Sequence, residues 1–215
     1  MPTFSHLHVH TQYSLLDGAA SIEGLYEKAI DDNMPAIAIT DHGNMFGAFK
    51  FVSQAWKKTK VIGKDADGKD ILAPIVKPIV GCEFYVVKDR HIKNFTKELK
   101  DNRYHQVLLA KNAIGYQNLI KLTSLGYIEG MYSKYPRIDK SLIEKYHEGL
   151  IATTCCIGAH VPQAILKSDE AAAEKEFKWW LDIFGEDYYI EIQRHQIPEQ
   201  QVINDRLLQF AKKYK

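Results

Sequence analysis

Phe4-Ser-His-Leu-His-Val-His-Thr-Gln-Tyr-Ser-Leu-Leu-Asp-Gly18 is a dense run of potential metal ligands, with three histidines at alternate positions and an aspartate seven residues after the last. Successive side chains of a β-strand point to opposite faces, so a strand over residues 4–10 would place His6, His8 and His10 on one side. Two imidazoles on one face can hold one metal ion. The alternative is that these histidines are simply half-exposed strand residues.

The composition is that of an ordinary globular domain. The chain has 215 residues, of which 46% are hydrophobic and 26% charged, with a net charge of +1. These values exclude a wholly disordered chain and an overall cationic coat for nucleic acid, but they leave room for a local basic patch. A chain of this length can form one large domain or two small ones, and we expect one core.

The cysteine pattern and the absence of long apolar runs favour a location in the cytoplasm. Cys82, Cys155 and Cys156 form neither a Cys-x-x-Cys pair nor the even framework of a small secreted domain, which favours the reducing cytoplasm. No signal-peptide pattern and no apolar run of membrane-spanning length occurs, so we expect no membrane partner.

Short runs rich in Ile, Val, Phe and Tyr alternate with stretches of helical periodicity, which is typical of a parallel sheet or barrel covered by helices. We expect strands at 4–10, 35–40, 78–87, 104–110, 149–154 and 187–193. We expect helices at 21–33, 44–58, 112–126, 140–147, 160–167, 169–184 and from 198 onward.

Two of these helices carry more detailed expectations. Ser21 is a plausible N-cap of the first, with Leu25, Ala29 and Ile30 on one face, and Asn112 can cap the helix that follows it. The periodicity of the 44–58 helix predicts that it turns four apolar residues toward a core: Phe46, Phe49, Ala55 and Trp56.

Three stretches break the alternation. Residues 59–77 predict an inserted hairpin with a tight turn at Asp67-Gly68; a calcium loop is the alternative, but the closing glutamate of an EF-hand is missing. Residues 127–138, which include Arg137, predict a surface loop or a contact with a partner or nucleotide. The last helical pattern stops at Lys215 without a cap, which indicates a frayed helix or, as the alternation favours, a fragment of a longer chain.

Polar side chains follow or interrupt two of the apolar strands. Asp41 and His42 come directly after the 35–40 strand, at the carboxyl end where functional groups gather in parallel α/β folds. Glu83 lies inside the 78–87 strand, where a carboxylate is costly to bury unless it is paired or binds a metal. The alternatives are a helix cap for Asp41, a hydrogen-bonded loop residue for His42 and a solvent-facing position for Glu83.

Later strands add further candidates. His105 begins the 104–110 strand, although a lone histidine is more often structural. Cys155 and Cys156 follow the 149–154 strand, and only one of two adjacent side chains can face a given site, the other being small apolar packing. The last strand and its extension place three candidates on one face, Glu191, Gln193 and His195, beside Arg194, which is either a phosphate contact or a surface residue.

Histidines, carboxylates and one thiol at successive strand ends together predict a metal cluster at one end of the fold. Mixed nitrogen and oxygen ligands suit zinc, manganese or iron, and bridging carboxylates allow more than one ion. Neighbouring divalent ions lower the pKa of water, hold phosphate oxygens and stabilise in-line displacement. The chemistry that these residues predict is therefore phosphoester hydrolysis.

The sequence also resembles a known family. His8-Val-His10-Thr, Ile39-Thr-Asp-His-Gly43, Gly81-Cys-Glu83 and His105 resemble the motifs of the PHP (polymerase and histidinol phosphatase) superfamily. Longer strings, Leu7–Gly18, His105–Asn112 and Tyr189–His195, resemble the N-terminal PHP domain of bacterial DNA polymerase III alpha subunits. The resemblance covers nearly the whole of residues 1–215, apart from the 59–77 hairpin.

The resemblance implies an α/β fold that is a distorted, seven-stranded, TIM-like β/α barrel with metal ligands at the carboxyl ends of its strands. The ligands that it implies are His8, His10, Asp17, His42, Glu83, His105 and Cys156. Cys156 is preferred to Cys155 because Cys156-Ile-Gly-Ala-His-Val-Pro162 matches the family motif. His6 falls outside the motif, and Asp41 would orient a ligand.

The pattern differs from the family at its end, because the family completes its site with an Asp-x-His on a further strand. Residues 1–215 lack that motif, so we expect a PHP domain fragment that is truncated before its last strand. We expect it to bind fewer than the three divalent ions (Zn, Mn or Fe) of an intact domain.

The resemblance implies part of a DNA-directed DNA polymerase, without the polymerase active site itself. The expected activity is a metal-dependent phosphoesterase, namely a proofreading 3′–5′ exonuclease, in which His8, His10, His42 and Glu83 act through bound metal. The implied partners are a single-stranded 3′ end or primer terminus of DNA and the rest of the polymerase chain. The alternative is an inactive module that docks a separate proofreading exonuclease subunit, and a standalone histidinol-phosphate phosphatase fits less well.

Overall fold

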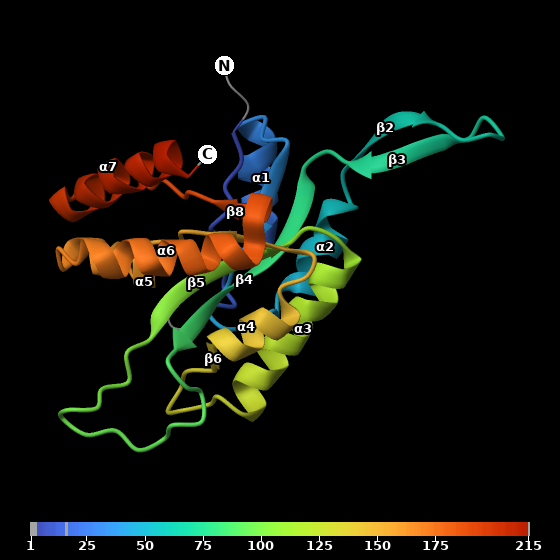
Figure 1. Ribbon diagram of the computed structural model, residues 1–215. Coiled ribbons are helices and arrows are strands. Elements are labelled where there is room, and N and C mark those ends of the chain that lie inside the picture. The colour runs from blue at the N-terminus through green and yellow to red at the C-terminus, as the bar shows by residue number, and fades with distance from the viewer. Residues whose placement is uncertain (1–3, 16, 215) are drawn as a thin grey trace. The chain divides into compact units, whose positions relative to one another are not determined.

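The chain folds into two compact units, Met1–Cys82 and Glu83–Lys215, and the boundary falls within one long strand. The computed structural model (Figure 1) describes residues 4–15 and 17–214. Leu16 of the opening motif and Lys215 of the last helical pattern therefore lie outside the described residues. None of the helices within the described part is long and apolar enough to cross a membrane.

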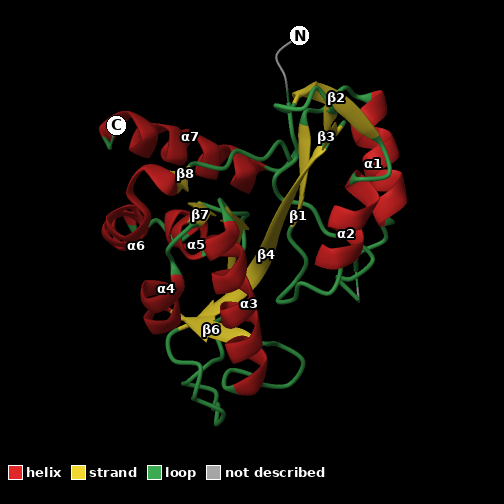
Figure 2. Cartoon of the chain, turned by 90° about the vertical axis from the view of Figure 1, so that its right-hand side faces the viewer, coloured by secondary structure: helices red, strands yellow, loops and turns green. Residues whose placement is uncertain are grey.

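Unit 1 places two helices beside a parallel strand pair, as Figure 2 shows. Its elements are α1 (Ile22–Asp31), β1 (Ala36–Ile39), α2 (Ala48–Ala55), β2 (Thr59–Lys64), β3 (Asp70–Pro74) and the start of β4 (Lys77–Val87). β1 pairs in parallel with β4, with Ile39 opposite Val80. The core combines α1, α2 and β1 side chains, among them Ile22, Tyr26, Ile37 and Phe51.

The helix start expected at Ser21 is confirmed, because its side chain accepts a hydrogen bond from the Gly24 backbone N–H at 3.1 Å. The strand expected at residues 4–10 is wrong. Backbone bonds join Ala38 N to His6 O and Thr40 N to Val9 O, but the Val9 N–H donates to the Thr40 side chain instead of a backbone carbonyl. This side chain interrupts the ladder, so the segment runs beside β1 without becoming a strand.

The prediction for α2 is also wrong for its aromatic residues. Phe46, Phe49 and Trp56 are exposed by 58%, 84% and 54%, and the buried face is formed by Ala48, Phe51 and Ala55. Periodicity shows that a helix has an apolar face, but this helix carries large apolar side chains on both faces. Only packing against α1 decides which face is buried.

The expected antiparallel hairpin is present as β2 and β3, with Lys64 opposite Asp70. Its turn is held by Asp65, whose side chain accepts hydrogen bonds from the backbone N–H groups of Asp67 and Lys69. Gly68 has a φ of 78°, a conformation that glycine adopts without strain.

Unit 2 contains the remainder of β4 and the later elements. They are β5 (Tyr104–Ala110), α3 (Ala113–Ile128), β6 (Arg137–Asp139), α4 (Lys140–Tyr146), β7 (Leu150–Thr153), α5 (His160–Leu166), α6 (Glu170–Phe184), a short 3-10 turn (Gly185–Asp187), β8 (Tyr188–Tyr189) and α7 (Pro198–Lys213). Asn112 caps α3 as expected, accepting from the Gly115 N–H at 3.0 Å.

The strand order in this unit is β4-β5-β7-β8, with β6 also beside β4. β6 pairs with β4 and β8 with β7 in parallel, whereas β5 and β7 are antiparallel. The fold is thus mixed α/β with many parallel pairs. No pairing among residues 4–15 and 17–214 closes a barrel, and the strand expected at 187–193 is reduced to two residues.

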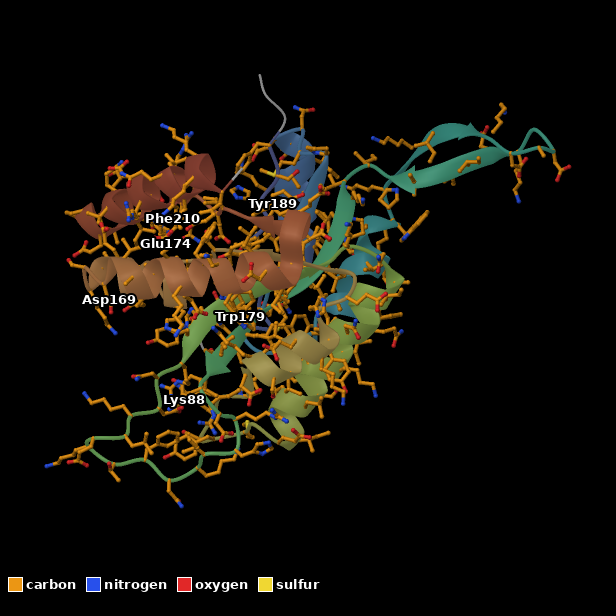
Figure 3. All side chains as sticks on the ribbon, in the orientation of Figure 1. Lys88, Asp169, Glu174, Trp179, Tyr189 and Phe210 are labelled. Atoms are coloured by element: carbon orange, nitrogen blue, oxygen red, sulfur yellow. The ribbon has the colours of Figure 1, made fainter. Side chains whose placement is uncertain are left out.

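Helices α6 and α7 pack together in unit 2. The rings of Phe177 and Phe210 have centroids 5.0 Å apart, and Glu174 pairs with Lys213. Figure 3 shows Glu174 and Phe210 in the region where the two helices face each other. This packing helps to bury Phe177, which is 3% exposed.

Arg137 corrects the prediction of a surface loop or partner contact for residues 127–138. The residue belongs to β6 and is fully buried. A charged side chain is buried only when its hydrogen bonds are satisfied. The prediction of a surface position was wrong because the sequence does not show which groups accept hydrogen bonds from Arg137.

Candidate metal centre

Four of the seven predicted ligands belong to unit 1 and three belong to unit 2, and the ligands of each unit are described in turn. In unit 1, the rings of His10 and His42 stack with centroids 4.0 Å apart, and the His8 ring lies 5.3 Å from that of His10. His42 Nε2 lies 3.1 Å from the carboxylate of Asp17. The segment before α1 and the loop after β1 therefore bring three imidazoles and one carboxylate together.

Asp41 joins these two loops. Its buried carboxylate accepts hydrogen bonds from Thr11 N at 2.6 Å, Thr11 Oγ1 at 2.8 Å and Ser14 Oγ at 2.8 Å. Ser14 Oγ in turn contacts His10 Nδ1 at 3.1 Å and accepts from the His42 N–H at 3.2 Å. Asp41 therefore positions two histidines through Ser14. Sequence reasoning missed Thr11 and Ser14, although a Thr-x-x-Ser spacing beside the histidines was a signal for them.

In unit 2, Glu83, His105 and Cys156 form the second group. Each residue offers one donor atom, and these atoms all lie within 4.8 Å of one another. His105 Nδ1 is 3.2 Å from Glu83 Oε1 and 3.5 Å from Cys156 Sγ, and Sγ is 3.8 Å from Glu83 Oε2. β4, β5 and the turn after β7 supply the three side chains.

The electrostatics of this group favour a thiolate beside an imidazolium. A hydrogen bond from Cys155 and another from His105 lower the pKa of Cys156 to about 5, although burial acts in the opposite direction. Burial alone would lower the pKa of His105, but its hydrogen bonds to Cys156 and Glu83 raise it to about 10. At neutral pH the thiol is therefore already in the form that binds metals.

The loop 155–159 shapes this group. Cys155 has a φ of 58°, a region that a non-glycine residue rarely adopts, and its side chain is buried while that of Cys156 is partly exposed. Gly158 O accepts from the His105 N–H at 3.0 Å, and a Cβ atom at Gly158 would lie 3.0 Å from His105 Nδ1. Gly158 therefore leaves room for the imidazole, a role that sequence reasoning missed.

The donor set suits a divalent transition metal. Imidazole nitrogen, carboxylate oxygen and thiolate are the ligands of zinc and iron sites, and carboxylates with imidazole also suit manganese. A buried carboxylate at Glu83, with 2% of its side chain exposed, is expensive unless cations are near. The residues present therefore fit a metal ion, and they do not decide which metal it is.

Other candidates lie outside these groups. His6 contacts the ring of Phe4, and His195 and Arg194 are exposed. Glu191 accepts a hydrogen bond from Thr153 Oγ1 at 2.7 Å and one from Gln193, so these two side chains brace the end of β7. The common face expected for residues 191–195 is not formed, because the strand ends at Tyr189.

Alkylation should detect the thiolate. In metal-free protein, the rate of Cys156 labelling by iodoacetamide is expected to rise with a midpoint near pH 5, well below that of an ordinary thiol, at about 8.5. Because Cys82 and Cys155 are buried, mass spectrometry should find the label on Cys156. His105→Ala removes one hydrogen bond and should move the midpoint upward, and added Zn²⁺ should protect the thiol. A wild-type midpoint of 8 or above would contradict the paired thiolate.

The fold and the donor groups define the class of protein. The PHP domain model matches residues 6–195, and the chain belongs to this family. The fold is similar to that of a proposed metal-dependent phosphoesterase from Bifidobacterium adolescentis, with a TM-score of 0.57 and 12% sequence identity over 99% of this chain and 84% of the other. At that identity the likeness concerns the fold alone.

The sequence relatives are more specific. The chain is 46% identical over 209 residues to DNA polymerase III subunit alpha of Borreliella burgdorferi, covering 97% of this chain and 17% of the relative. The corresponding proteins of Thermus aquaticus and Aquifex aeolicus are 44% and 43% identical, each over 98% of this chain and 16% and 17% of their own length. These comparisons confirm the predicted resemblance, and the chain spans only about a sixth of the length of these relatives.

Proposed function

We propose that this PHP domain is part of a DNA polymerase III alpha subunit and hydrolyses phosphodiesters in a metal-dependent way, as a proofreading 3′–5′ exonuclease in DNA replication. The observation that carries the proposal is the Glu83, His105 and Cys156 group, with its buried carboxylate and low-pKa thiol. The likeness to polymerase alpha subunits supports DNA and the rest of the polymerase chain as partners.

The proposed ligand set is the one implied by the family: His8, His10, Asp17, His42, Glu83, His105 and Cys156. Divalent ions (Zn, Mn or Fe) held by these residues, fewer than the three of an intact domain, would supply Lewis-acid activation of a phosphoryl oxygen and of a water molecule. The seven-stranded barrel of the family belongs to the same proposal, as does a cytoplasmic location.

The chain's own side chains prepare the site. Asp41, acting through Ser14, holds His10 and His42 in position. His105, with its pKa raised to about 10, must give up a proton from its ring before Nδ1 can become a ligand, so metal binding in unit 2 should release a proton. The Glu83 carboxylate lies 3.2 Å from His105 Nδ1 and offers a second donor beside it.

Metal removal tests the proposal. The chain is purified, its metal content is measured by mass spectrometry, and hydrolysis of a single-stranded oligonucleotide carrying a 3′-terminal label is followed before and after dialysis against a chelator. We expect bound transition metal, release of 3′-terminal nucleotides, loss of that activity on chelation and recovery when Mn²⁺ or Zn²⁺ is added back. A 5′-labelled oligonucleotide with a blocked 3′ end is the control.

The other outcomes are equally informative. Absence of bound transition metal, with no binding when metal is added, would overturn the metal-site proposal. Bound metal without hydrolysis would favour the inactive module that docks a separate exonuclease subunit. Release of phosphate from histidinol phosphate, with no action on DNA, would favour the small-molecule phosphatase.

A further inference from the structure

Helix α2 exposes an aromatic stripe. Phe49 and Trp56 lie seven residues apart, so they share one face of the helix and are separated by about 10 Å along its axis. They are exposed by 84% and 54%, and the opposite face buries Phe51 and Ala55 at 0% and 3%. Exposed apolar groups that gather on one face of a protein often mark a binding site.

The stripe lies in the most strongly basic stretch of unit 1. Between Asp41 and Asp65 there are five lysines and no acidic residue, in a chain whose net charge is only +1. Three of these lysines are exposed: Lys50 lies on α2, Lys57 follows its C-terminal end and Lys60 belongs to β2. The charge is therefore concentrated in the same stretch of sequence as the aromatic residues.

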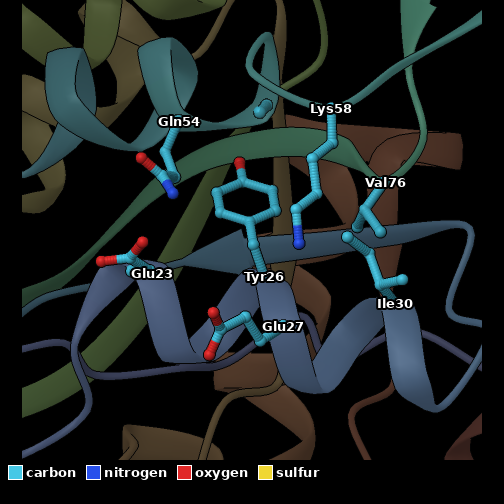
Figure 4. A pocket seen from close by; sticks show the side chains of 8 residues that line it. Glu23, Tyr26, Glu27, Ile30, Gln54, Lys58 and Val76 are labelled. Atoms are coloured by element: carbon cyan, nitrogen blue, oxygen red, sulfur yellow. The ribbon is translucent and has the colours of Figure 1, made fainter.

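One lysine of this stretch has a different position. Lys58 lines a cavity of about 50 Å³ between α1 and α2, together with Tyr26, Glu23 and Glu27 (Figure 4). Lys58 is itself exposed, but it lines this cavity beside two glutamates and is left out of the stripe. The basic stripe is therefore defined by Phe49, Lys50, Trp56, Lys57 and Lys60.

We propose that the basic stripe binds single-stranded nucleic acid, with bases stacked on Phe49 and Trp56 and phosphates held by Lys50, Lys57 and Lys60. Exposed aromatic rings interleaved with lysines are what single-strand binding requires, because every base has a face that can stack. A duplex hides those faces. A protein partner would use the aromatic rings, but the absence of acidic residues over the whole stretch favours a polyanion.

The inference extends the proposed function by naming a surface that holds the substrate strand. It rests on the proposed function in one respect, namely that the nucleic acid is taken to be DNA. Binding needs no metal and no turnover. Binding of the oligonucleotide is measured in the presence of a chelator, so it can be detected even if the chain does not hydrolyse DNA. Conversely, hydrolysis can be detected even if the basic stripe does not bind the strand.

The test uses fluorescence anisotropy of a labelled oligothymidylate of about 12 nucleotides with the whole chain in EDTA. Phe49→Ala/Trp56→Ala is expected to weaken binding roughly 30-fold or more, because removing each base–aromatic stack weakens binding by about five-fold to over a hundred-fold. The slope of log affinity against log salt should stay unchanged. Stacking on Trp56 should also quench tryptophan fluorescence of the wild type.

A second variant separates charge from stacking. Lys50→Gln/Lys57→Gln/Lys60→Gln is expected to reduce the magnitude of the salt slope by about 0.7 for each phosphate that a lysine no longer neutralises. Ile128→Ala, at a residue exposed by 78%, and Lys97→Gln/Lys121→Gln/Lys178→Gln, at exposed positions, are the matched controls and should bind as the wild type does. Circular dichroism checks that all variants fold.

Three results would overturn the inference. The first is a wild type that does not bind the oligonucleotide. The second is an aromatic variant that binds it as tightly as the wild type, and the third is an equal loss of binding in the control variants. A wild type that sediments as a dimer, and becomes monomeric only in Phe49→Ala/Trp56→Ala, would assign the stripe to a second copy of the chain instead.

Discussion

Replacing His8 and His10 together by alanine is expected to lower metal-dependent phosphodiester hydrolysis by about three orders of magnitude, equivalent to about 4 kcal/mol of transition-state stabilisation. Two of the imidazoles in the unit 1 group disappear, and His42 loses the ring on which it stacks at 4.0 Å. Of the four unit 1 ligands only Asp17 and His42 then remain, so two of the donors that a transition metal needs are lost.

The fold should survive this change, because both histidines are only partly buried and the Asp41 contacts to Thr11 and Ser14 remain. Single-turnover rates with a 3′-labelled oligonucleotide and metal content are measured together. His91→Ala/His195→Ala, at two exposed histidines outside both groups, is the matched control. Unchanged hydrolysis in the His8/His10 variant would remove the unit 1 group from the chemistry.

Arg137→Ala is expected to lower the free energy of unfolding of unit 2 by about 3–5 kcal/mol, as happens when one member of a buried ion pair is removed. The guanidinium is fully buried and donates to Asp101 Oδ1 at 2.8 Å, Gly130 O at 2.9 Å, Ile92 O at 2.8 Å and Arg90 O at 3.1 Å. Alanine would leave three carbonyl groups and a carboxylate without this donor, inside a cavity of its own making.

Urea unfolding measures this effect through tryptophan fluorescence, to which Trp180, buried in unit 2, contributes. Since whole domains are stable by about 5–15 kcal/mol, a loss of this size should shift the midpoint strongly. Arg103→Ala is the control, because Arg103 bonds the same Asp101 but is partly exposed, and it should cost about 1 kcal/mol or less. Equal effects of the two substitutions would show that burial of Arg137 contributes little.

Most elements were predictable because their signals are local. Ser21 and Asn112 cap helices as expected, since capping depends on a side chain and a backbone group three residues away. The 59–77 hairpin followed from Asp67-Gly68 and its flanking residues. Polar residues next to apolar runs indicated His42, Glu83 and His105 as candidate ligands, whereas the full ligand set is what the family resemblance implies.

The main errors concern residues whose environment depends on partners that are distant in the sequence. Residues 4–10 have the alternation of a strand, but the Thr40 side chain replaces one of the backbone groups that the ladder needs. Phe49 and Trp56 looked like core residues, and Arg137 looked like a surface residue. In each case the residue type was compatible with two environments, and the partner that decides between them lies elsewhere in the chain.

The opening stretch shows the same division. By itself, the sequence determined that His8, His10 and Asp17 are potential ligands, because their chemistry and spacing are local properties. Only the tertiary structure decided that Asp41 and Ser14 hold His10 and His42, and that Gly158 and Cys155 shape the surroundings of His105 and Cys156. Hydrogen bonds and close packing are set by distances in space, and those distances depend on how the rest of the chain has already folded.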